Sequence, residues 1–257
     1  MLRSRKHEWR RADLRSFEDA AGKLIVGLDF PDADQARKLL KELEGIPCYM
    51  KVGLQLFYAA GPELIRELKQ RGYSVFLDVK MHDIPNTVKG GANSVTKLGV
   101  DLFNVHAGGG LDMMKAAREG ALAALESDRS LTMPKIIAVT QLTSTSRQVM
   151  NEEIGIPGEV ERAVVHYAEL ARQAGLDGVV ASPLEVTAIK AQCGQAFLTV
   201  TPGIRPANSP QGDQSRTLTP GEAMAQGTDY IVVARPIIAA PNPREAAESI
   251  IKEMMLS

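Results

Sequence analysis

Two carboxylates and an ammonium group fall within six residues in the segment Asp78-Val79-Lys80-Met81-His82-Asp83. Residues 75–80 are typical of a short β-strand, and the two-residue period of a strand puts Asp78 and Lys80 on one face. Such charges are costly at the end of an apolar strand unless they pair. Taken alone, the Asp-x-Lys pattern fits a salt bridge that only closes a protein surface as well as it fits a reactive lysine.

Two further charged residues favour the reactive interpretation. Asp29 ends the apolar run LIVGLDF, and Lys51 lies in a second predicted strand, MKVGL. If neighbouring strands bring them to Asp78 and Lys80, lysines and aspartates alternate around one point. This arrangement is expensive for stability alone. It therefore indicates a site where a lysine acts on a substrate.

A second group of residues is suited to phosphate. Arg205 lies in TPGIRP, Arg235 lies in VVARPI, and Gln214 belongs to the long aperiodic segment 204–218. A guanidinium offers a planar fork of donors that matches phosphate oxygens. A single surface arginine is commonly only solvated, but two on adjacent loops predict an anion site. The 204–218 segment is predicted to be a lid or binding loop over it.

Eight apolar runs that alternate with helical patterns would position these side chains. The predicted strands cover 24–30, 48–54, 75–80, 102–107, 135–142, 178–182, 197–204 and 230–237. The helical patterns cover 32–44, a stretch after Pro62, 84–98, 111–126, 157–174, 184–193, 220–226 and 243–255. This alternation predicts right-handed βαβ units and an α/β fold, the (β/α)8 TIM barrel.

A doubly wound open sheet is the alternative architecture. The sequence after the first strand is DFPDAD, which lacks the Gly-x-Gly-x-x-Gly turn of a dinucleotide-binding sheet. In a barrel the active site lies at the C-terminal ends of the strands. Further polar residues at those predicted ends are His106, Gln141, Thr143, Ser182 and Thr201.

Composition sets the remaining bounds. The 257 residues are 44% hydrophobic, enough for one large core, and 30 basic against 31 acidic residues leave a net charge of −1. The balance argues against a general nucleic-acid binder, and the absence of a long apolar run argues against a membrane span. Cys48 and Cys193 are too few and too far apart for a disulfide framework or zinc site. We expect a cytoplasmic protein with one barrel domain, residues 23–257, after an N-terminal extension, residues 1–22, of unknown role.

Seven motifs in order resemble the orotidine 5′-phosphate decarboxylase family. They are LIVGLDF, MKVGLQLF, FLDVKMHDIPNTV, VHAGGG, TQLTS, TPGIRP and IVVARPI, and together they extend from about residue 24 to residue 238. The Asp-x-Lys-x-x-Asp-Ile-Pro-Asn-Thr run is highly specific by itself. The resemblance implies decarboxylation of orotidine 5′-phosphate to uridine 5′-phosphate and carbon dioxide, the last step of de novo pyrimidine nucleotide synthesis, without a metal or cofactor.

The resemblance also implies a role for each matching residue. Lys80 would protonate C6 of the pyrimidine, Asp78 would lie beside the departing carboxylate, and Lys51 would hold Asp78 and the ribose hydroxyls. The other implied substrate contacts are Asp29 to the ribose, Thr143 to the pyrimidine, and Pro202, Arg205, Gln214, Ala234 and Arg235 on the phosphate side. Members of this family are homodimers with shared active sites, in which Asp83 and Thr87 would reach the neighbouring subunit's substrate.

Two features depart from the family pattern. Ala234 occupies a position where the family usually has glycine; if the backbone there requires a positive φ, the β-carbon costs about 1 kcal/mol. The first 20 residues are also longer than the usual lead-in, and the family assigns them no role.

Two rival functions remain at this point. The first is a magnesium-dependent sugar-phosphate decarboxylase of the 3-keto-gulonate 6-phosphate type, which shares Asp-x-Lys-x-x-Asp but has a glutamate metal ligand where this chain has Lys51. The second is a non-catalytic sensor of phosphoribosyl nucleotides. The presence of Lys51, Asp78 and Lys80 argues against a sensor, because a degenerate barrel has no need of them.

Overall fold

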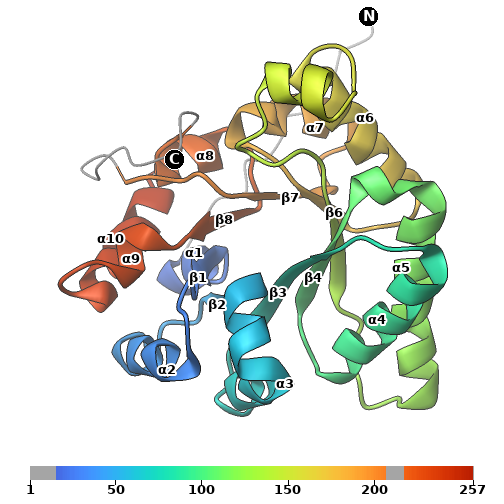
Figure 1. The fold of residues 1–257 in the computed structure, drawn as a ribbon. Coiled ribbons are helices and arrows are strands. Elements are labelled where there is room, and N and C mark those ends of the chain that lie inside the picture. The colour runs from blue at the N-terminus through green and yellow to red at the C-terminus, as the bar shows by residue number, and fades with distance from the viewer. Residues whose placement is uncertain (1–15, 207–216, 257) are drawn as a thin grey trace, which may run out of the picture.

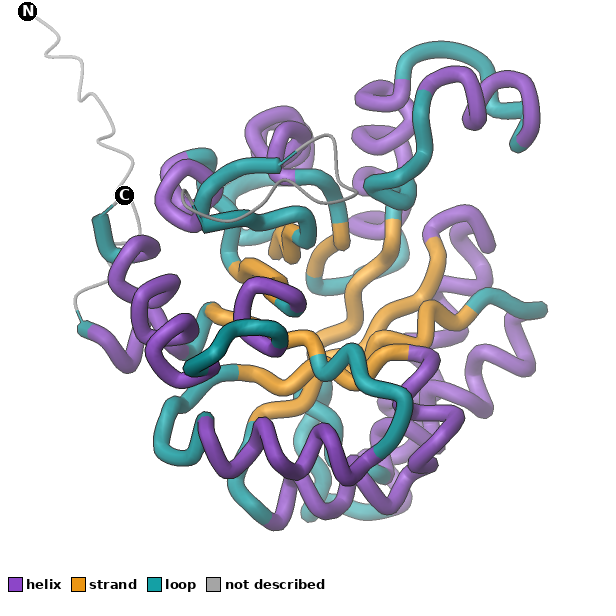
Figure 2. Tube along the Cα trace, turned by 60° about the vertical axis from the view of Figure 1, so that its left-hand side comes forward, coloured by secondary structure: helices purple, strands orange, loops and turns teal. Residues whose placement is uncertain are grey.

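Eight parallel strands close into a barrel in the computed structural model, which describes residues 16–206 and 217–256. Each strand pairs with its neighbours in chain order, and β8 pairs with β1 to complete the ring. Helices surround the strands on the outside, as Figures 1 and 2 show. The prediction of a (β/α)8 barrel is confirmed.

The strands are short and the helices between them are longer. The strands are β1 (Leu24–Gly27), β2 (Tyr49–Gly53), β3 (Ser74–Met81), β4 (Leu102–His106), β5 (Lys135–Val139), β6 (Gly178–Val180), β7 (Leu198–Thr201) and β8 (Tyr230–Val233). The helices are α1 (Phe17–Ala21), α2 (Ala33–Glu42), α3 (Leu54–Gln70), α4 (Pro85–Lys97), α5 (Gly110–Ser127), α6 (Val160–Gln173), α7 (Val186–Cys193), α8 (Pro220–Ala225), α9 (Arg235–Ile238) and α10 (Pro243–Met254).

Several predicted strands end earlier in the structure than expected, among them 24–30 at Gly27, 135–142 at Val139 and 197–204 at Thr201. Two further errors concern where helices start. The helical segment expected only after Pro62 begins at Leu54, because Gly61, with φ of 66°, interrupts one long segment that resumes at Pro62. The strand expected over 230–237 ends at Val233, and residues 235–238 form the short helix α9. Both errors arise because apolar runs continue from a strand into the helix that follows it, so hydrophobicity alone does not mark the junction.

Two layers of apolar side chains make the core. The larger layer lies between the strands and the surrounding helices. The smaller one fills the barrel interior with buried side chains from five strands: Ile25, Phe76, Leu102, Ile137 and Val200. Because this plug is apolar, charged side chains do not lie in the middle of the barrel, and the strand ends are where they can gather.

The predicted extension, residues 1–22, includes α1. Its helix is capped by Ser16, whose hydroxyl accepts a hydrogen bond from the Asp19 N–H at 3.1 Å, and Ala20 and Ala21 are buried in the core. Residues 16–22 therefore pack with the barrel, while the proposed domain division at residue 22 stays a prediction. In the described part of the chain, no helix combines the length and apolar character needed to cross a membrane.

A repeated aspartate brace holds the N-terminal ends of alternate strands. Asp101, Asp177 and Asp229 immediately precede β4, β6 and β8. Their carboxylates each accept a backbone N–H from the preceding strand at 2.7 Å, the donors being Val75, Ile136 and Thr199. Each aspartate N–H in turn donates to the carbonyl of that same residue. The reciprocal pairs tie β3, β5 and β7 to the strands that follow them.

The Asp229 brace also neutralises a buried lysine. The Lys190 Nζ lies 2.6 Å from the Asp229 carboxylate and donates to the carbonyls of Gln195 and Phe197 at 3.0 and 2.8 Å. The Lys190 side chain is only 5% exposed. A buried ammonium that loses its counter-ion keeps its desolvation cost without the compensating attraction.

We expect Asp229→Ala to lower the free energy of unfolding by about 3 kcal/mol or more, because it leaves the buried Lys190 ammonium without its counter-ion. Asp177→Ala is the control, because it removes an equivalent backbone contact from an aspartate that holds no buried lysine in the described residues. It should lower the free energy of unfolding by about 1–2 kcal/mol. Urea denaturation followed by circular dichroism measures both. Adding Lys190→Met to Asp229→Ala should recover part of the lost free energy of unfolding, because it removes the unpaired charge. If the double variant is no more stable than Asp229→Ala, the unpaired charge is not the cause of the loss.

Candidate active site

A cavity of about 280 Å³ opens at the C-terminal ends of the strands. Phe76, Val139, Val180 and Val232 form its apolar walls, directly above the core plug. The polar and charged side chains that line it are Asp29, Lys51, Asp78, Lys80, Gln141, Thr143, Ser144 and Arg205. The predicted charged residues of the first three strands are thus brought together in one cavity.

Four of these residues form a chain of alternating charge. The Lys51 Nζ lies 3.2 Å from Asp29 Oδ1 and 3.4 Å from Asp78 Oδ2, so it stands between two carboxylates. The Lys80 Nζ donates to Asp78 Oδ1 at 2.6 Å. The Asp78 side chain is 13% exposed and that of Asp29 is 53% exposed. The two inner members, Lys51 and Asp78, are therefore the most buried, and the chain becomes more exposed toward Lys80, whose side chain is 29% exposed, and toward Asp29.

The charges around Asp78 determine its protonation state. Burial acts to raise the pKa of this carboxyl, but the nearby charges of Lys51 and Lys80 and hydrogen bonds from Lys80 and Asn104 outweigh it. The pKa of Asp78 consequently lies below its ordinary value. Asp78 is therefore an anion at neutral pH.

Lys80 has an unusual backbone. Its φ is 49°, and among the described residues it is the one non-glycine position with a positive φ. The pairing of β3 with β4 also shifts between Leu77 and Met81, so the strand is not regular there. Simple alternation correctly suggested that the side chains of Asp78 and Lys80 meet, but the sequence did not reveal the bulge that carries them. A lysine in this region costs about 1–3 kcal/mol, and such strain gathers at functional sites.

Asn104 is a site residue that sequence reasoning missed. It is fully buried on β4, where its Oδ1 accepts the Lys80 N–H at 2.8 Å and its Nδ2 donates to Asp78 Oδ1 at 2.7 Å. The available signal was one amide in the apolar strand LFNVH, since a buried amide requires partners. That signal does not say which partners.

His106 ends β4 beside this group. Its ring centroid lies 5.5 Å from that of His82. Burial, and after it the proximity of His82 and Lys80, lower the pKa of His106, against a smaller opposite effect of Asp78. His106 is therefore neutral at pH 7 and adds no further positive charge near Lys80.

The residues expected on the phosphate side are only partly assembled. Pro202 and Arg205 line the cavity. The Arg205 N–H donates to the Leu218 carbonyl at 3.0 Å, so this backbone amide already has a partner. Arg235 is exposed at the start of α9 and does not line the cavity in the described residues. Gln214 lies outside the described residues, as does most of the predicted 204–218 lid.

Ala234 carries no backbone strain. Its φ is −118°, so the anticipated cost of a β-carbon at positive φ does not arise. A β-carbon added to Gly27 would lie 2.8 Å from the Ala234 methyl and 3.3 Å from Lys51 Cε. There is room for one methyl group between β1 and the end of β8, and here Ala234 supplies it.

Asp83 and Thr87 are not among the residues that line this cavity. Both are exposed, Asp83 in the turn after β3 and Thr87 in the first turn of α4. Asp83 Oδ1 accepts the N–H of Ile84 at 2.6 Å, and Ile84 is itself 66% exposed. The structure thus leaves these two residues outside the cavity that the charge chain lines.

Two other polar residues at strand ends have structural roles. The Ser182 hydroxyl and Glu185 form a capping box at the turn before α7. Thr201 is buried and its hydroxyl lies 3.0 Å from that of Thr228. Within residues 16–206 and 217–256, no three His, Cys, Asp or Glu side chains are grouped as ligands of a metal ion would be.

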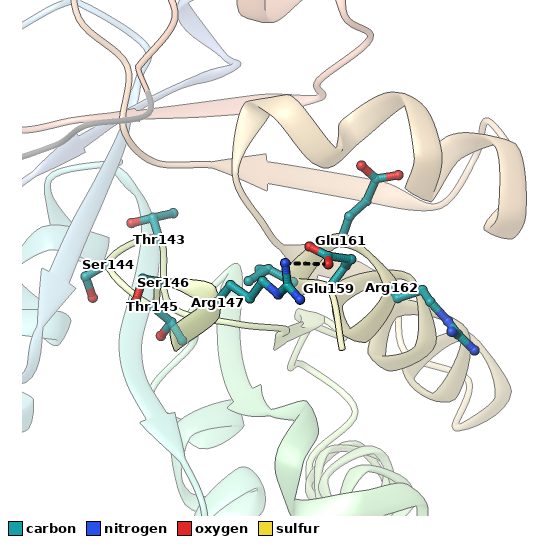
Figure 3. A pocket seen from close by; sticks show the side chains of 9 residues that line it. Thr143, Ser144, Thr145, Ser146, Arg147, Glu159, Glu161 and Arg162 are labelled. Carbon is teal, nitrogen blue, oxygen red and sulfur yellow. Dashed lines mark ion pairs between the residues drawn. The ribbon is translucent and has the colours of Figure 1, made fainter. Parts of the chain in front are cut away.

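A larger hollow of about 670 Å³ adjoins the cavity and is drawn in Figure 3. It lies between the loop after β5 and the start of α6, and shares Thr143 and Ser144 with the cavity. Arg147 is paired with Glu159 at 3.0 Å, and the Arg162 side chain points away from Thr143 (Figure 3). The charged chain lines the smaller cavity, so the candidate chemistry belongs there despite the difference in size.

Comparison with known proteins agrees with this geometry. A family model described as the orotidine 5′-phosphate decarboxylase / HUMPS family matches residues 22–250. The orotidine 5′-phosphate decarboxylase of Moorella thermoacetica is 51% identical over 237 residues, which cover 91% of this chain and 93% of the relative. That of Bacillus anthracis is 50% identical over 227 residues, covering 88% and 94%.

Solved structures give the same result. The crystal structure of orotidine 5′-phosphate decarboxylase from Lactobacillus acidophilus matches with a TM-score of 0.80 at 43% identity, covering 90% of this chain and 98% of that chain. An uncharacterized conserved protein from Geobacillus kaustophilus matches with a TM-score of 0.79 at 42% identity, covering 90% and 99%. The resemblance read from the sequence motifs is confirmed: the chain is a carboxy-lyase and belongs to the orotidine 5′-phosphate decarboxylase / HUMPS family.

Proposed function

We propose that this enzyme decarboxylates orotidine 5′-phosphate to uridine 5′-phosphate, with Lys80 as the proton donor. The observation that carries the proposal is the position of the Lys80 ammonium, 2.6 Å from Asp78 in an enclosed cavity with apolar walls. The names of the relatives supply the substrate. The (β/α)8 fold alone would not, because one fold serves many reactions.

The reaction requires a place for an electron pair. When the bond between C6 and the carboxylate breaks, carbon dioxide leaves and the bonding pair remains on C6. A charged Lys80 beside C6 stabilises that pair electrostatically and then transfers a proton to it, which forms the new C–H bond. Lys80 is left neutral and regains its proton from solvent. No cofactor is needed as an electron sink in this scheme.

Asp78 contributes a smaller effect. Its anion would lie beside the substrate carboxylate, and the repulsion disappears as carbon dioxide departs. At about 4 Å and an effective dielectric of about 20, one such pair is worth about 4 kcal/mol, or roughly a thousandfold in rate. Enzymes commonly exceed that acceleration by far, so stabilisation of the transition state by Lys80 is the main term.

Lys51 favours this reaction over the magnesium-dependent alternative. Its ammonium supplies the positive charge between Asp29 and Asp78, at 3.2 and 3.4 Å from their oxygens. A divalent ion at that point would be repelled by the lysine. In the proposed complex Lys51 holds Asp78 and, with Asp29, the ribose hydroxyls; Thr143 contacts the pyrimidine.

The active unit is proposed to be a homodimer. Asp83 and Thr87 are exposed and do not line their own cavity, and the adjacent Ile84 is an exposed apolar side chain. This fits a surface from which Asp83 and Thr87 enter the site of a second copy.

The phosphate is proposed to bind to Pro202, Arg205, Gln214, Ala234 and Arg235, with the 204–218 segment as the loop over it. A cytoplasmic location stays a prediction from the sequence.

Lys80→Ala should reduce turnover of orotidine 5′-phosphate by about 10⁴-fold or more, since both the electrostatic stabilisation and the proton are lost. The loss of ultraviolet absorbance from the substrate, measured with EDTA present, follows the reaction. Lys89→Ala is the matched control, because Lys89 is an exposed lysine paired with Glu119 at 2.9 Å on the outer helices. Appreciable activity in Lys80→Ala, or loss of wild-type activity in EDTA, would refute the assignment.

Arg235→Ala should weaken uridine 5′-phosphate binding by about 10- to 100-fold while changing uridine binding little, because a charged hydrogen bond to phosphate contributes about 1.5–3 kcal/mol. Isothermal titration calorimetry gives both affinities. Arg129→Ala, an exposed arginine before β5 at the other end of the barrel, is the control. Equal losses for nucleotide and nucleoside would show that Arg235 does not bind phosphate.

Mixed dimers test the shared site. Asp83→Asn and Lys80→Ala chains should each be inactive alone, but a co-refolded equal mixture should regain about one quarter of wild-type activity, because half of the dimers are mixed and each has one intact site. Turnover per protomer measures the effect. If the mixture gains nothing while gel filtration shows that mixed dimers form, each site is built from a single chain.

A further inference from the structure

Asn104 lies where the pairing of β3 and β4 fails. Leu77 pairs with Phe103 and Met81 pairs with Val105, so three residues of β3, at positions 78–80, lie opposite the single residue Asn104. The backbone of one residue cannot form the hydrogen bonds that three residues of a regular strand require. The side chain of Asn104 supplies one of the missing bonds, because its amide oxygen accepts the Lys80 N–H at 2.8 Å.

The other end of the same amide holds the reactive carboxylate. Asn104 Nδ2 donates to Asp78 Oδ1 at 2.7 Å, the same oxygen that accepts from Lys80 Nζ at 2.6 Å. Asn104 has no exposed surface, so its amide, and not bulk water, makes both contacts in the native protein. One neutral side chain thus contacts both the backbone of Lys80 and the side chain of Asp78.

These contacts matter because the Lys80 backbone is strained. A residue with φ of 49° persists only when its surroundings hold it there, and Asn104 supplies the hydrogen bond at the strained residue's own N–H. An apolar residue of similar size would leave that N–H and one bond of Asp78 unsatisfied.

We propose that Asn104 is a positioning residue that sets Lys80 and Asp78 in their reactive arrangement by binding both at once. The inference rests on the proposed decarboxylation for its kinetic part. Asn104 itself touches no reacting atom; it acts through the strained backbone and the carboxylate.

The same contact biases the charge of Asp78. The groups that face Asp78 are Lys51 from β2, Lys80 from its own strand and His106 from β4, with Asp29 beyond Lys51. Lys51, Lys80 and the amide donor favour the anion, and the amide is one of the causes that lower the pKa of Asp78. Removing Asn104 therefore raises this pKa. Because the anion is the active form, the acidic limb of the rate profile must move to higher pH.

Two variants separate the two contacts. Asn104→Asp keeps an acceptor for the Lys80 N–H but replaces the donor with a second carboxylate against Asp78, whereas Asn104→Ala removes both contacts. Asn93→Ala is the control, since Asn93 donates to the Gly120 carbonyl at 3.2 Å between α4 and α5, away from the cavity. Asn104→Asp also serves if Asn104→Ala fails to fold, because it is almost isosteric.

We expect kcat for orotidine 5′-phosphate to fall about 10- to 100-fold in both Asn104 variants, with KM and uridine 5′-phosphate affinity changed less than about threefold. The acidic limb of the kcat profile should move to higher pH in both, and neither change should occur in Asn93→Ala. Carbon-13 NMR of labelled aspartate, recorded without substrate, should show the Asp78 carboxyl titrating at higher pH in the Asn104 variants.

Three results would overturn the proposal: wild-type kcat in both Asn104 variants, an unchanged Asp78 titration, or a loss of kcat matched by an equal loss of nucleotide affinity, which indicates general damage. Failure of the proposed function is a different observation. If the wild-type protein does not decarboxylate orotidine 5′-phosphate, the substrate-free titration of Asp78 alone decides whether Asn104 sets the carboxylate.

Discussion

The structure depends on placing two ammonium groups around one largely buried carboxylate. Asp78 lies 3.4 Å from the Lys51 Nζ and 2.6 Å from the Lys80 Nζ, above an apolar core plug. Separately, each charge would carry a large desolvation cost, and as a group they offset it. The group is stable because its charges alternate, and the same arrangement holds the Lys80 Nζ 2.6 Å from the Asp78 carboxylate. Stability and reactivity therefore have one physical origin.

The two ends of the barrel divide these tasks. At the N-terminal ends, Asp101, Asp177 and Asp229 bond the backbone of the preceding strand in the same reciprocal way, so these side chains extend the regular pairing of the strands. At the C-terminal ends the ladder is broken between Leu77 and Met81, and the chain accepts a strained lysine. Because the N-terminal ends of the strands are firmly paired, the C-terminal ends can hold the strained backbone of Lys80 without loosening the barrel.

Small residues decide how closely the charged stems can pack. A β-carbon on Gly27 would lie 2.8 Å from the Ala234 methyl and 3.3 Å from Lys51 Cε, so the space between them is too small for a further methyl group. The departure from the family pattern at Ala234 is accommodated because its φ is negative and its neighbour is a glycine. The size of side chain that fits at position 234 is therefore limited by β1, a strand more than 200 residues away in the chain.

The sequence by itself determined the architecture and the charged motif. Eight apolar runs that alternate with helical patterns are local signals, and the Asp-x-Lys spacing along one strand needs only the two-residue period of β-structure to bring the side chains together. Helix starts inside continuous apolar runs, such as those at Leu54 and Arg235, were missed because hydrophobicity does not distinguish a strand end from the next helix. Only the tertiary structure decided the bulge at Lys80, the role of Asn104 and the separation of Asp83 from its own cavity. Each of these depends on which backbone and side-chain groups from distant strands are left without partners, and the pairing of strands far apart in the chain settles that.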